Sequence, residues 1–185
     1  MAAVTVAHTS QLDHGSLESA RLMVRAAFVR GRTGSVSGEF TDEDWEHALG
    51  GMHALVHDGG ELVAHGSVVQ RRFLLAGRAW RVGYVEAVGV AAGSRRRGHG
   101  SAVMGALEAV IRRAYDLGAL SATDDGAPLY RSRGWQLWQG PAAALTPSGV
   151  VRTPDEDGSV HVLVVGQRPD VTRPLTCDWR DGDLW

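Results

Sequence analysis

The sequence predicts an α/β (α+β) protein with a single mixed, mostly antiparallel sheet and helices on both faces. Three observations support this fold class. Segments with apolar residues at helical spacing alternate with segments typical of strands. The turn-forming runs 58–60 and 76–77 separate three consecutive strand segments, as in hairpins. The predicted order is strand, two helices, three strands, helix, strand, helix and further strands.

The first half of the chain contains the hairpin strands and two helices. A short strand is predicted at residues 4–8. Thr41 and Asp44 are typical of a capping box, here opening a short helix that ends at Gly50-Gly51. The run 31–38 is predicted to be a flexible loop, because it consists mainly of turn and linker residues. Apolar residues at helical spacing predict a helix that includes Leu17, Ala20, Val24, Ala27 and Phe28. Strand signals predict strands at 52–57, 62–75 and 79–90.

The second half begins with a predicted amphipathic helix from Ser101 to Leu117, in which Glu108 and Arg112 can pair on the polar face. We expect a strand at 119–122, a small helix around 128–132, strands at 135–138 and 160–165, and a tail over 166–185. The length of 185 residues and the 44% hydrophobic content predict one domain over residues 1–185.

Composition argues against several classes of function. The formal charge is −2 and residues 95–97 form the only basic cluster, which argues against nucleic-acid binding; RNA contact there would show strong salt dependence. One cysteine, no signal-peptide profile and no apolar run of membrane-spanning length predict a cytoplasmic protein without a membrane segment. His53 and His57 have a metal-site interval, but in a strand it separates the rings by about 13 Å, so no metal is expected.

The run Arg95-Arg96-Arg97-Gly98-His99-Gly100 lies between an apolar strand and a helix. Unpaired backbone N–H groups and the positive end of a helix dipole form a docking place for a phosphate pair. Glycine lets the backbone approach those phosphates closely. We name residues 95–100 the glycine turn and predict that it binds a phosphorylated cofactor. The alternative is a solvated basic turn with a glycine hinge.

Glu86 is the strongest candidate for a catalytic base. It is the one carboxylate among apolar and aromatic residues on its face of the strand 79–90, just before the glycine turn. Burying a carboxylate costs free energy unless the group is used or paired, so the alternative is a salt bridge to Arg71 or Arg72. Small residues on the other face of the strand would let an extended cofactor arm lie along the backbone; these are Gly83, Ala87 and Gly89.

The pattern Arg95-x-x-Gly98-x-Gly100 resembles the pyrophosphate-binding signature of the acetyl-CoA-dependent N-acetyltransferase (GNAT) superfamily. Six further blocks resemble the aminoglycoside 2'-N-acetyltransferases of mycobacteria: residues 41–47, 50–55, 83–86, 130–135, 152–155 and 177–180. The resemblance implies the GNAT acyl-CoA N-acyltransferase fold and acetyl transfer from acetyl-CoA to the 2'-amino group of an aminoglycoside, conferring resistance. It implies cofactor contacts at Val88, Gly89, Val90, Arg95, Arg96, Arg97, Gly98, His99 and Gly100.

Tyr130 matches the tyrosine that protonates the departing thiolate in this superfamily. A phenol with a pKa near about 10 can return a proton to a thiolate and still be neutral at rest. The alternative is a core tyrosine with its hydroxyl at the surface. Neither Cys177 nor any serine has the setting of a nucleophile, so we expect direct transfer in a ternary complex. Two other functions fit the same residues: acetyl transfer to another small metabolic amine, and acyl-CoA binding without turnover.

Acidic residues suit a polycationic acceptor, such as an aminoglycoside or a related polyamine, if the fold gathers them in one cleft. The alternative is that they cap a helix and solvate turns. Compared with relatives, the run 31–38 is longer, and Glu39 and Glu156 replace aspartates. The resemblance also implies a homodimer and a tail that contributes to the acceptor site. The implied acceptor contacts are Glu39, Asp44, Glu86, Ala87, Ser121, Asp155, Glu156, Asp183 and the terminal carboxylate of Trp185.

Overall fold

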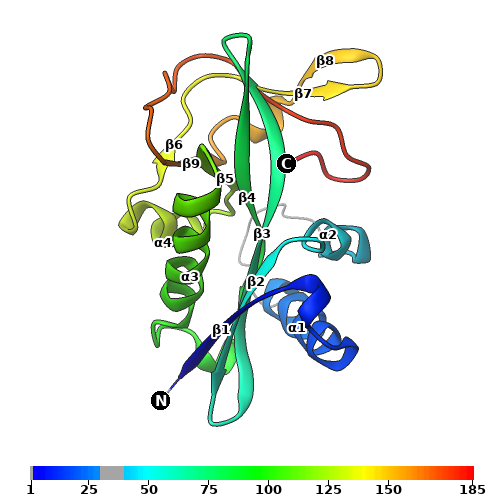
Figure 1. Cartoon of the computed structure of the whole chain (residues 1–185), viewed down its shortest axis with the longest axis vertical. Coiled ribbons are helices and arrows are strands. Elements are labelled where there is room, and N and C mark those ends of the chain that lie inside the picture. The colour runs from blue at the N-terminus through cyan, green and yellow to red at the C-terminus, as the bar shows by residue number, and fades with distance from the viewer. Residues whose placement is uncertain (1, 30–39) are drawn as a thin grey trace. The chain divides into compact units, whose positions relative to one another are not determined.

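The structure is a computed structural model that describes residues 2–29 and 40–185 (Figure 1). Glu39 and the predicted loop at 31–38 lie outside the described residues. The chain divides into two compact units, residues 1–69 with 85–110 and residues 70–84 with 111–185. Two long strands, β3 (Glu61–Leu75) and β4 (Arg78–Val90), contribute residues to both units.

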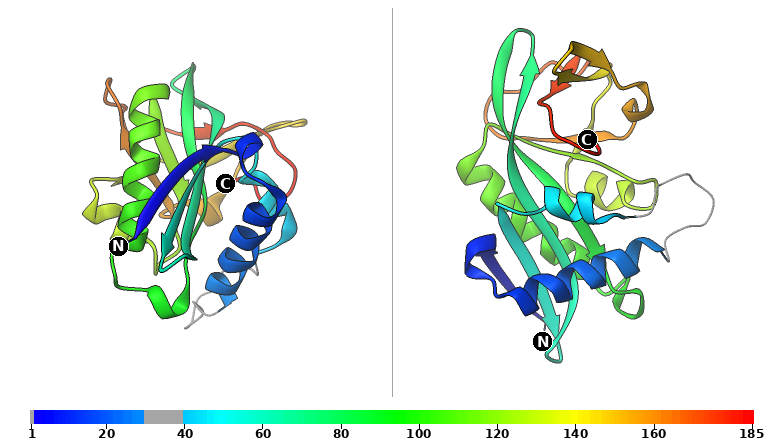
Figure 2. Two further views of the ribbon diagram at one scale, coloured as in Figure 1. Left: turned by 60° about the horizontal axis from the view of Figure 1, so that its bottom comes forward. Right: turned by 90° about the vertical axis from the view of Figure 1, so that its right-hand side faces the viewer.

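The first unit contains a meander covered by helices. Strand β1 (Ala3–His8) pairs antiparallel with β2 (Met52–Asp58), and β2 pairs antiparallel with β3, which confirms the predicted strands and the turn at 58–60. A 3₁₀ turn over Thr9–Gln11 leads from β1 to α1 (His14–Val29). Figure 2 shows α1 and α2 (Asp42–His47) on one side of these strands.

Glycines let the helices pack closely on the strands of the first unit. A Cβ added to Gly89 would lie 3.3 Å from the backbone of Val24 in α1, and one added to Gly66 would lie 2.7 Å from Val103 in α3 (His99–Ala114). The helices α1 and α3 therefore lie on opposite faces of the sheet, as predicted. The capping box is also confirmed, because Thr41 Oγ1 accepts the Asp44 N–H at 3.2 Å and Asp44 accepts the Thr41 N–H at 2.7 Å.

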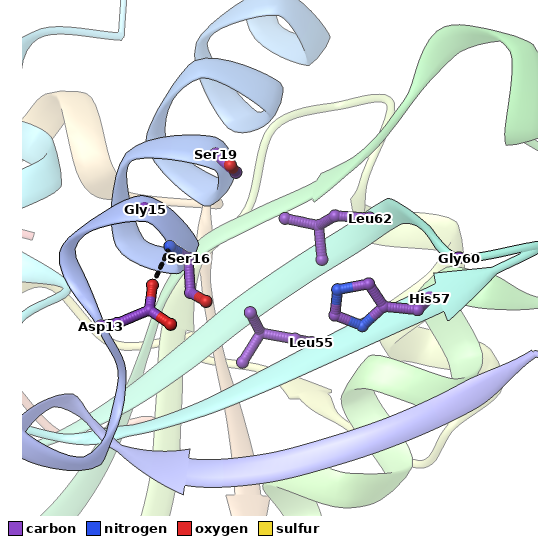
Figure 3. A pocket seen from close by; sticks show the side chains of 8 residues that line it. All are labelled: Asp13, Gly15, Ser16, Ser19, Leu55, His57, Gly60 and Leu62. Carbon is purple, nitrogen blue, oxygen red and sulfur yellow. Dashed lines mark hydrogen bonds between the residues drawn. The ribbon is translucent and has the colours of Figure 1, made fainter.

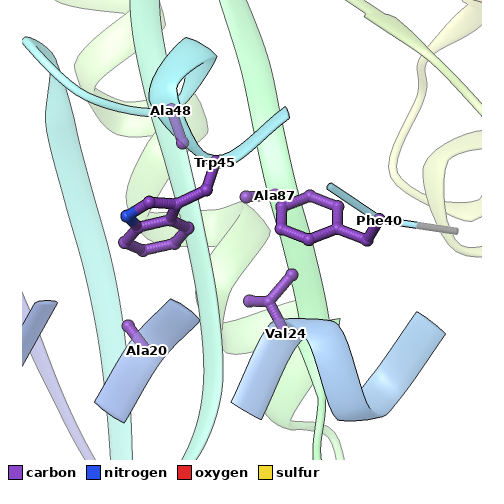
Figure 4. Packing of buried hydrophobic residues seen from close by; sticks show 6 residues of the cluster. All are labelled: Ala20, Val24, Phe40, Trp45, Ala48 and Ala87. Atoms are coloured by element: carbon purple, nitrogen blue, oxygen red, sulfur yellow. The ribbon is translucent and has the colours of Figure 1, made fainter. Parts of the chain in front are cut away.

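The core of the first unit between the sheet and helices α1 and α2 is a small hydrophobic cluster (Figure 4). It joins side chains from both helices to the end of β4, and the indole of Trp45 is its largest group. Ala20, Val24 and Ala48 are at most 1% exposed. The buried members of the cluster are Ala20, Val24, Phe40, Trp45, Ala48 and Ala87.

The second unit contains residues 70–84 of β3 and β4 together with six further strands, and the order along the sheet is β6-β9-β5-β4-β3-β10-β7-β8. The pairs β4–β5 and β7–β10 are parallel, and the other registers recorded along this path are antiparallel, so the predicted mixed, mostly antiparallel sheet is confirmed. A small helix, α4 (Ala127–Ser132), lies where one was predicted. The strands are β5 (Leu117–Ser121), β6 (Gln136–Leu137), β7 (Ala142–Thr146), β8 (Gly149–Arg152), β9 (Val160–Val164) and β10 (Leu175–Cys177).

Two expectations about the long helix and the strand after it are wrong. Helix α3 ends at Ala114, and β5 begins at Leu117 rather than at residue 119. The cause is Asp116, whose N–H donates to Arg81 O at 2.9 Å while its carboxylate accepts the Arg81 N–H at 3.0 Å, which brings Leu117 opposite Val82. Glu108 is 3% exposed, so it belongs to the buried side of α3 and not to a solvated face.

Candidate functional site

The last part of β4 is bent at Ala87, which has a left-handed φ of 50°. In the second unit, a Cβ on Gly83 would lie 2.6 Å from the ring of Tyr115, just after α3. In the first unit, Ala87 belongs to the cluster formed with α1, and Gly89 also contacts α1. The expected single face of small residues is therefore wrong, because the bend at Ala87 interrupts the alternation of the strand.

Glu86 is partly buried and directly precedes this bend. The predicted alternative for it was a salt bridge to Arg71 or Arg72. In the second unit, however, the Arg71 guanidinium donates to the C-terminal segment, through Nε to Asp178 Oδ1 at 2.8 Å and Nη1 to Leu184 O at 2.8 Å. Arg72 is exposed, and its backbone N–H donates to Asp178 Oδ2 at 3.0 Å. The catalytic role of Glu86 stays a prediction.

The glycine turn presents backbone donors at the start of α3. In the part of the chain that the structure describes, no hydrogen bond starts from the backbone N–H groups of residues 95–101, and the first is that of Ala102 to Gly98 O at 3.0 Å. Gly98 has a φ of 86°, and a Cβ there would meet no atom within 4 Å, so the space beside it is open. These features suit a diphosphate.

Two of the three arginines hold the glycine turn in place. Arg95 Nη2 donates to Ala27 O of α1 at 2.8 Å, and Arg97 Nη2 donates to Asp58 Oδ2 at 2.8 Å. His99 is buried, with its Nε2 3.9 Å from the same Asp58 oxygen. The side chains of Arg95 and Arg97 therefore have structural partners, and the backbone amides with Arg96 are the groups best placed to meet a ligand.

Tyr130 is the last apolar residue of α4 and is 8% exposed. Its ring lies 6.2 Å from that of Trp135 and 6.4 Å from that of His161. Burial raises the pKa of the Tyr130 hydroxyl to about 12, because the phenolate would lose its hydration. The group therefore holds its proton at neutral pH, as a proton donor to a thiolate requires.

Four predicted acceptor contacts gather in the second unit. Glu156 lies in a 3₁₀ turn, Pro154–Glu156, and accepts a hydrogen bond from Ser121 Oγ at 2.7 Å. Burial, with added repulsion from Asp183 and Asp155, raises the pKa of Glu156, although the Ser121 bond and the positive charge of Arg180 act in the opposite direction. The fold thus places three carboxylates near one another at a cost in repulsion that a cationic ligand would relieve. Asp44 belongs to the first unit, where its carboxylate serves the capping box.

The C-terminal residue is held by contacts that sequence reasoning missed. Trp185 is 4% exposed; its ring packs edge-on against Phe73 at 5.2 Å and its Nε1 donates to Thr153 Oγ1 at 2.9 Å. Arg180 Nη2 donates to Trp185 O at 2.7 Å, so the predicted acceptor contact is already paired with a cation. The available signal in the sequence was Arg71, which lies in a strand between Val69 and Phe73 on the same face and whose guanidinium donates to Leu184 O.

A hollow of about 340 Å³ lies in the first unit between the start of α1 and the β2–β3 hairpin (Figure 3). Asp13 Oδ1 accepts the Ser16 N–H there at 2.7 Å, which caps α1. None of the predicted site residues lines this hollow. Its lining residues are Asp13, Gly15, Ser16, Ser19, Leu55, His57, Gly60 and Leu62.

The family model of the acetyltransferase (GNAT) domain matches residues 11–138 of the chain, a stretch that includes β4, the glycine turn and α3. The chain belongs to the GNAT acetyltransferases. As a GNAT protein it is 52% identical, over 96% of its length and 89% of the relative's, to an aminoglycoside 2'-N-acetyltransferase of Mycolicibacterium fortuitum.

Solved GNAT structures show the same fold at low identity. A GNAT family acetyltransferase from Brucella melitensis, in complex with acetyl-CoA, is 12% identical with a TM-score of 0.61, and 94% of each chain is covered. Eis1 from Mycobacterium abscessus is 19% identical with a TM-score of 0.59 over 77% of this chain. The match covers 33% of the Eis1 chain, so our GNAT chain spans about a third of that protein's length.

No helix in the described ranges 2–29 and 40–185 is both long and apolar enough to cross a membrane. Across these same ranges there is also no group of three or more histidine, cysteine or acidic side chains that could hold a metal ion.

Proposed function

We propose that the protein transfers the acetyl group of acetyl-CoA directly to the 2'-amino group of an aminoglycoside, which would confer resistance to such antibiotics. The observation that carries this proposal is the relative of that name, 52% identical over 96% of the chain. The carboxylates around Glu156 support it independently, because a polycationic amine would relieve their mutual repulsion.

The reaction requires the chain to bind acetyl-CoA, to take a proton from the amine and to give a proton to the thiolate. The N–H groups of the glycine turn bind the diphosphate of acetyl-CoA, and the main chain of Val88, Gly89 and Val90 holds its arm. Glu86 takes the proton from the amine, through a water molecule, while the nitrogen attacks the thioester carbon. The new N–C bond forms, the C–S bond breaks, and Tyr130 gives its proton to the departing thiolate.

The acceptor would be bound through its ammonium groups. Asp155, Glu156 and Asp183 supply negative charge, and Ser121 already bonds Glu156. We assign further contacts to the Trp185 carboxylate, to Ala87 and to the carboxylates of Asp44 and Glu39. By the family resemblance, we also propose a cytoplasmic homodimer.

The test is a thiol-release assay with acetyl-CoA and two aminoglycosides that differ only at position 2', where one has an amine and the other a hydroxyl. We expect coenzyme A release with the first and not with the second, and mass analysis should place one acetyl group on the 2' nitrogen. Equal release with both would contradict the regiospecificity. Release only with small unrelated amines would favour a metabolic acceptor, and acetyl-CoA binding without release would favour a non-catalytic module.

A further inference from the structure

A buried chain of hydrogen bonds crosses the first unit from the 3₁₀ turn after β1 to β4. Thr9 Oγ1 lies 2.8 Å from His53 Nε2, His53 Nδ1 lies 2.9 Å from His65 Nε2, and His65 Nδ1 lies 3.0 Å from Ala87 O. Both histidines are 0% exposed. We call these four residues the histidine chain. Its last member is the bent residue that follows Glu86.

The donor and acceptor of each hydrogen bond in the histidine chain follow from its last acceptor, the Ala87 carbonyl oxygen. A carbonyl oxygen only accepts, so His65 Nδ1 must carry a hydrogen. A neutral imidazole has one N–H, so His65 Nε2 accepts from His53 Nδ1, and His53 Nε2 in turn accepts from the Thr9 hydroxyl. The other acceptor near that hydroxyl, Gly51 O at 3.2 Å, already receives the Thr9 backbone N–H at 3.0 Å.

The surroundings keep both rings neutral. Burial lowers the pKa of His65 to about 3 and that of His53 to about 4, because an imidazolium would lose its hydration. The Trp45 ring lies 5.3 Å from that of His65 and 6.3 Å from that of His53, so an apolar group covers the pair. With both rings neutral, each ring donates through Nδ1 and accepts at Nε2, and all three bonds of the histidine chain are satisfied.

The bond to Ala87 acts on the backbone next to the catalytic base. A φ of 50° is unfavourable for alanine, by about 1–3 kcal/mol, and persists only where its surroundings hold it. Two groups do so here: the Ala87 methyl is buried in the cluster of α1 and α2 (Figure 4), and its carbonyl is fixed by His65. A peptide unit is planar and trans, so a fixed Ala87 C=O also fixes the Val88 N–H in the opposite direction.

We propose that His53 and His65 are positioning residues for acetyl transfer: through the Ala87 carbonyl they aim the Val88 N–H at the thioester oxygen and fix the backbone that carries Glu86. The inference rests on the proposed function, since it assigns this part of β4 to the thioester. A backbone donor aimed at the developing oxyanion stabilises the transition state more than the ground state. The histidine chain should therefore affect kcat more than it affects binding of coenzyme A.

The test compares His65→Leu, which removes the donor, with His65→Asn, whose amide nitrogen can take the place of Nδ1. We expect His65→Leu to lower kcat about 10²-fold and to leave the dissociation constant of coenzyme A within about threefold. His65→Asn should recover most of the loss. Val68→Ala, a buried truncation in the same strand, is the matched control for lost packing. An equal fall in kcat for Val68→Ala and His65→Leu would overturn the proposal.

Spectroscopy tests the same positioning without turnover, so it separates this inference from the proposed function. In the wild-type protein, ¹⁵N NMR should show both imidazoles protonated at Nδ1 and unprotonated at Nε2. The Val88 amide signal should move in His65→Leu and return toward its wild-type position in His65→Asn. If His65→Leu does not fold, Thr9→Val removes the far donor and should move the same signal by less. The opposite tautomers, or an unmoved Val88 signal, would refute the histidine chain even if aminoglycosides are acetylated.

Discussion

Replacement of Arg71 by leucine should release the C-terminal segment from the second unit. Arg71 is 4% exposed, and its guanidinium makes three hydrogen bonds of 2.8 Å, to Asp178 Oδ1, Asp178 O and Leu184 O. It also lies over the Tyr84 ring, with 4.9 Å between Cζ and the ring centroid. One side chain therefore joins β3 to both ends of the last eight residues.

The expected loss of unfolding free energy follows from the partner groups that the substitution leaves unpaired. Breaking a buried ion pair from one side costs about 3–5 kcal/mol. The Asp178 side chain is 36% exposed and its Oδ2 keeps the Arg72 N–H, so water can partly replace the lost partner. We therefore expect the lower end, about 3 kcal/mol of unfolding free energy. For a chain of this size that corresponds to a fall in Tm of about 6–12 °C.

The assay is thermal and urea unfolding of Arg71→Leu beside Arg72→Leu. The second variant is a matched control, because Arg72 is exposed and its backbone N–H, which binds Asp178, is retained. The control should change stability by no more than about 0.5 kcal/mol. Arg71→Lys should not restore the loss, because one ammonium cannot reproduce the planar fork of donors. A loss below about 1 kcal/mol for Arg71→Leu would refute the reasoning.

Three further outcomes are expected. Glu86→Gln should lower kcat by about 10²–10⁴-fold in the thiol-release assay with little change in acetyl-CoA affinity; an unchanged kcat would exclude Glu86 as the base. Gly98→Val should weaken coenzyme A binding in calorimetry, because a β-branched residue opposes a φ of 86° and its side chain enters the open space beside the turn; undiminished affinity would count against the diphosphate assignment. Glu156 has a pKa above its usual 4.5 in the folded protein, so the folded state holds that proton more tightly and unfolding free energy falls as pH rises from 4.5 through the raised value. Glu156→Gln should remove this part of the pH dependence in urea unfolding and raise the KM for a polycationic acceptor, and a pH dependence identical to wild type would contradict the assignment.

Local signals in the sequence were reliable where a few neighbouring residues decide the structure. Thr41 and Asp44 form the predicted capping box, and the turns at 58–60 and 76–77 join the strands expected on either side. The alanine-rich β7, the adjacent β8 and the three-residue β10 were not predicted. Alanine has little preference for a strand, and these strands depend on partners distant in the chain, since β10 pairs with both β3 and β7.

In the candidate site too, some features were predicted from neighbouring residues and others depend on contacts between distant segments. The glycine turn was predicted from six consecutive residues, because unpaired amides before a helix are a local property of the backbone. Strand alternation failed at Ala87, where long-range contacts hold a left-handed φ. The sequence also did not show that Asp155, Glu156 and Asp183 lie near one another, which the acceptor hypothesis required. The fold of the second unit brings them together.

The sequence by itself determined the order of helices and strands as far as the small helix α4, the family, and the two residues proposed to move protons, because these depend on motifs that are each read within a short segment. Only the tertiary structure decided that His65 bonds a carbonyl 22 residues away and that Arg71 binds a carboxylate 107 residues away. Buried polar groups must find partners wherever folding places them, and their choice depends on packing between segments rather than on spacing along the chain.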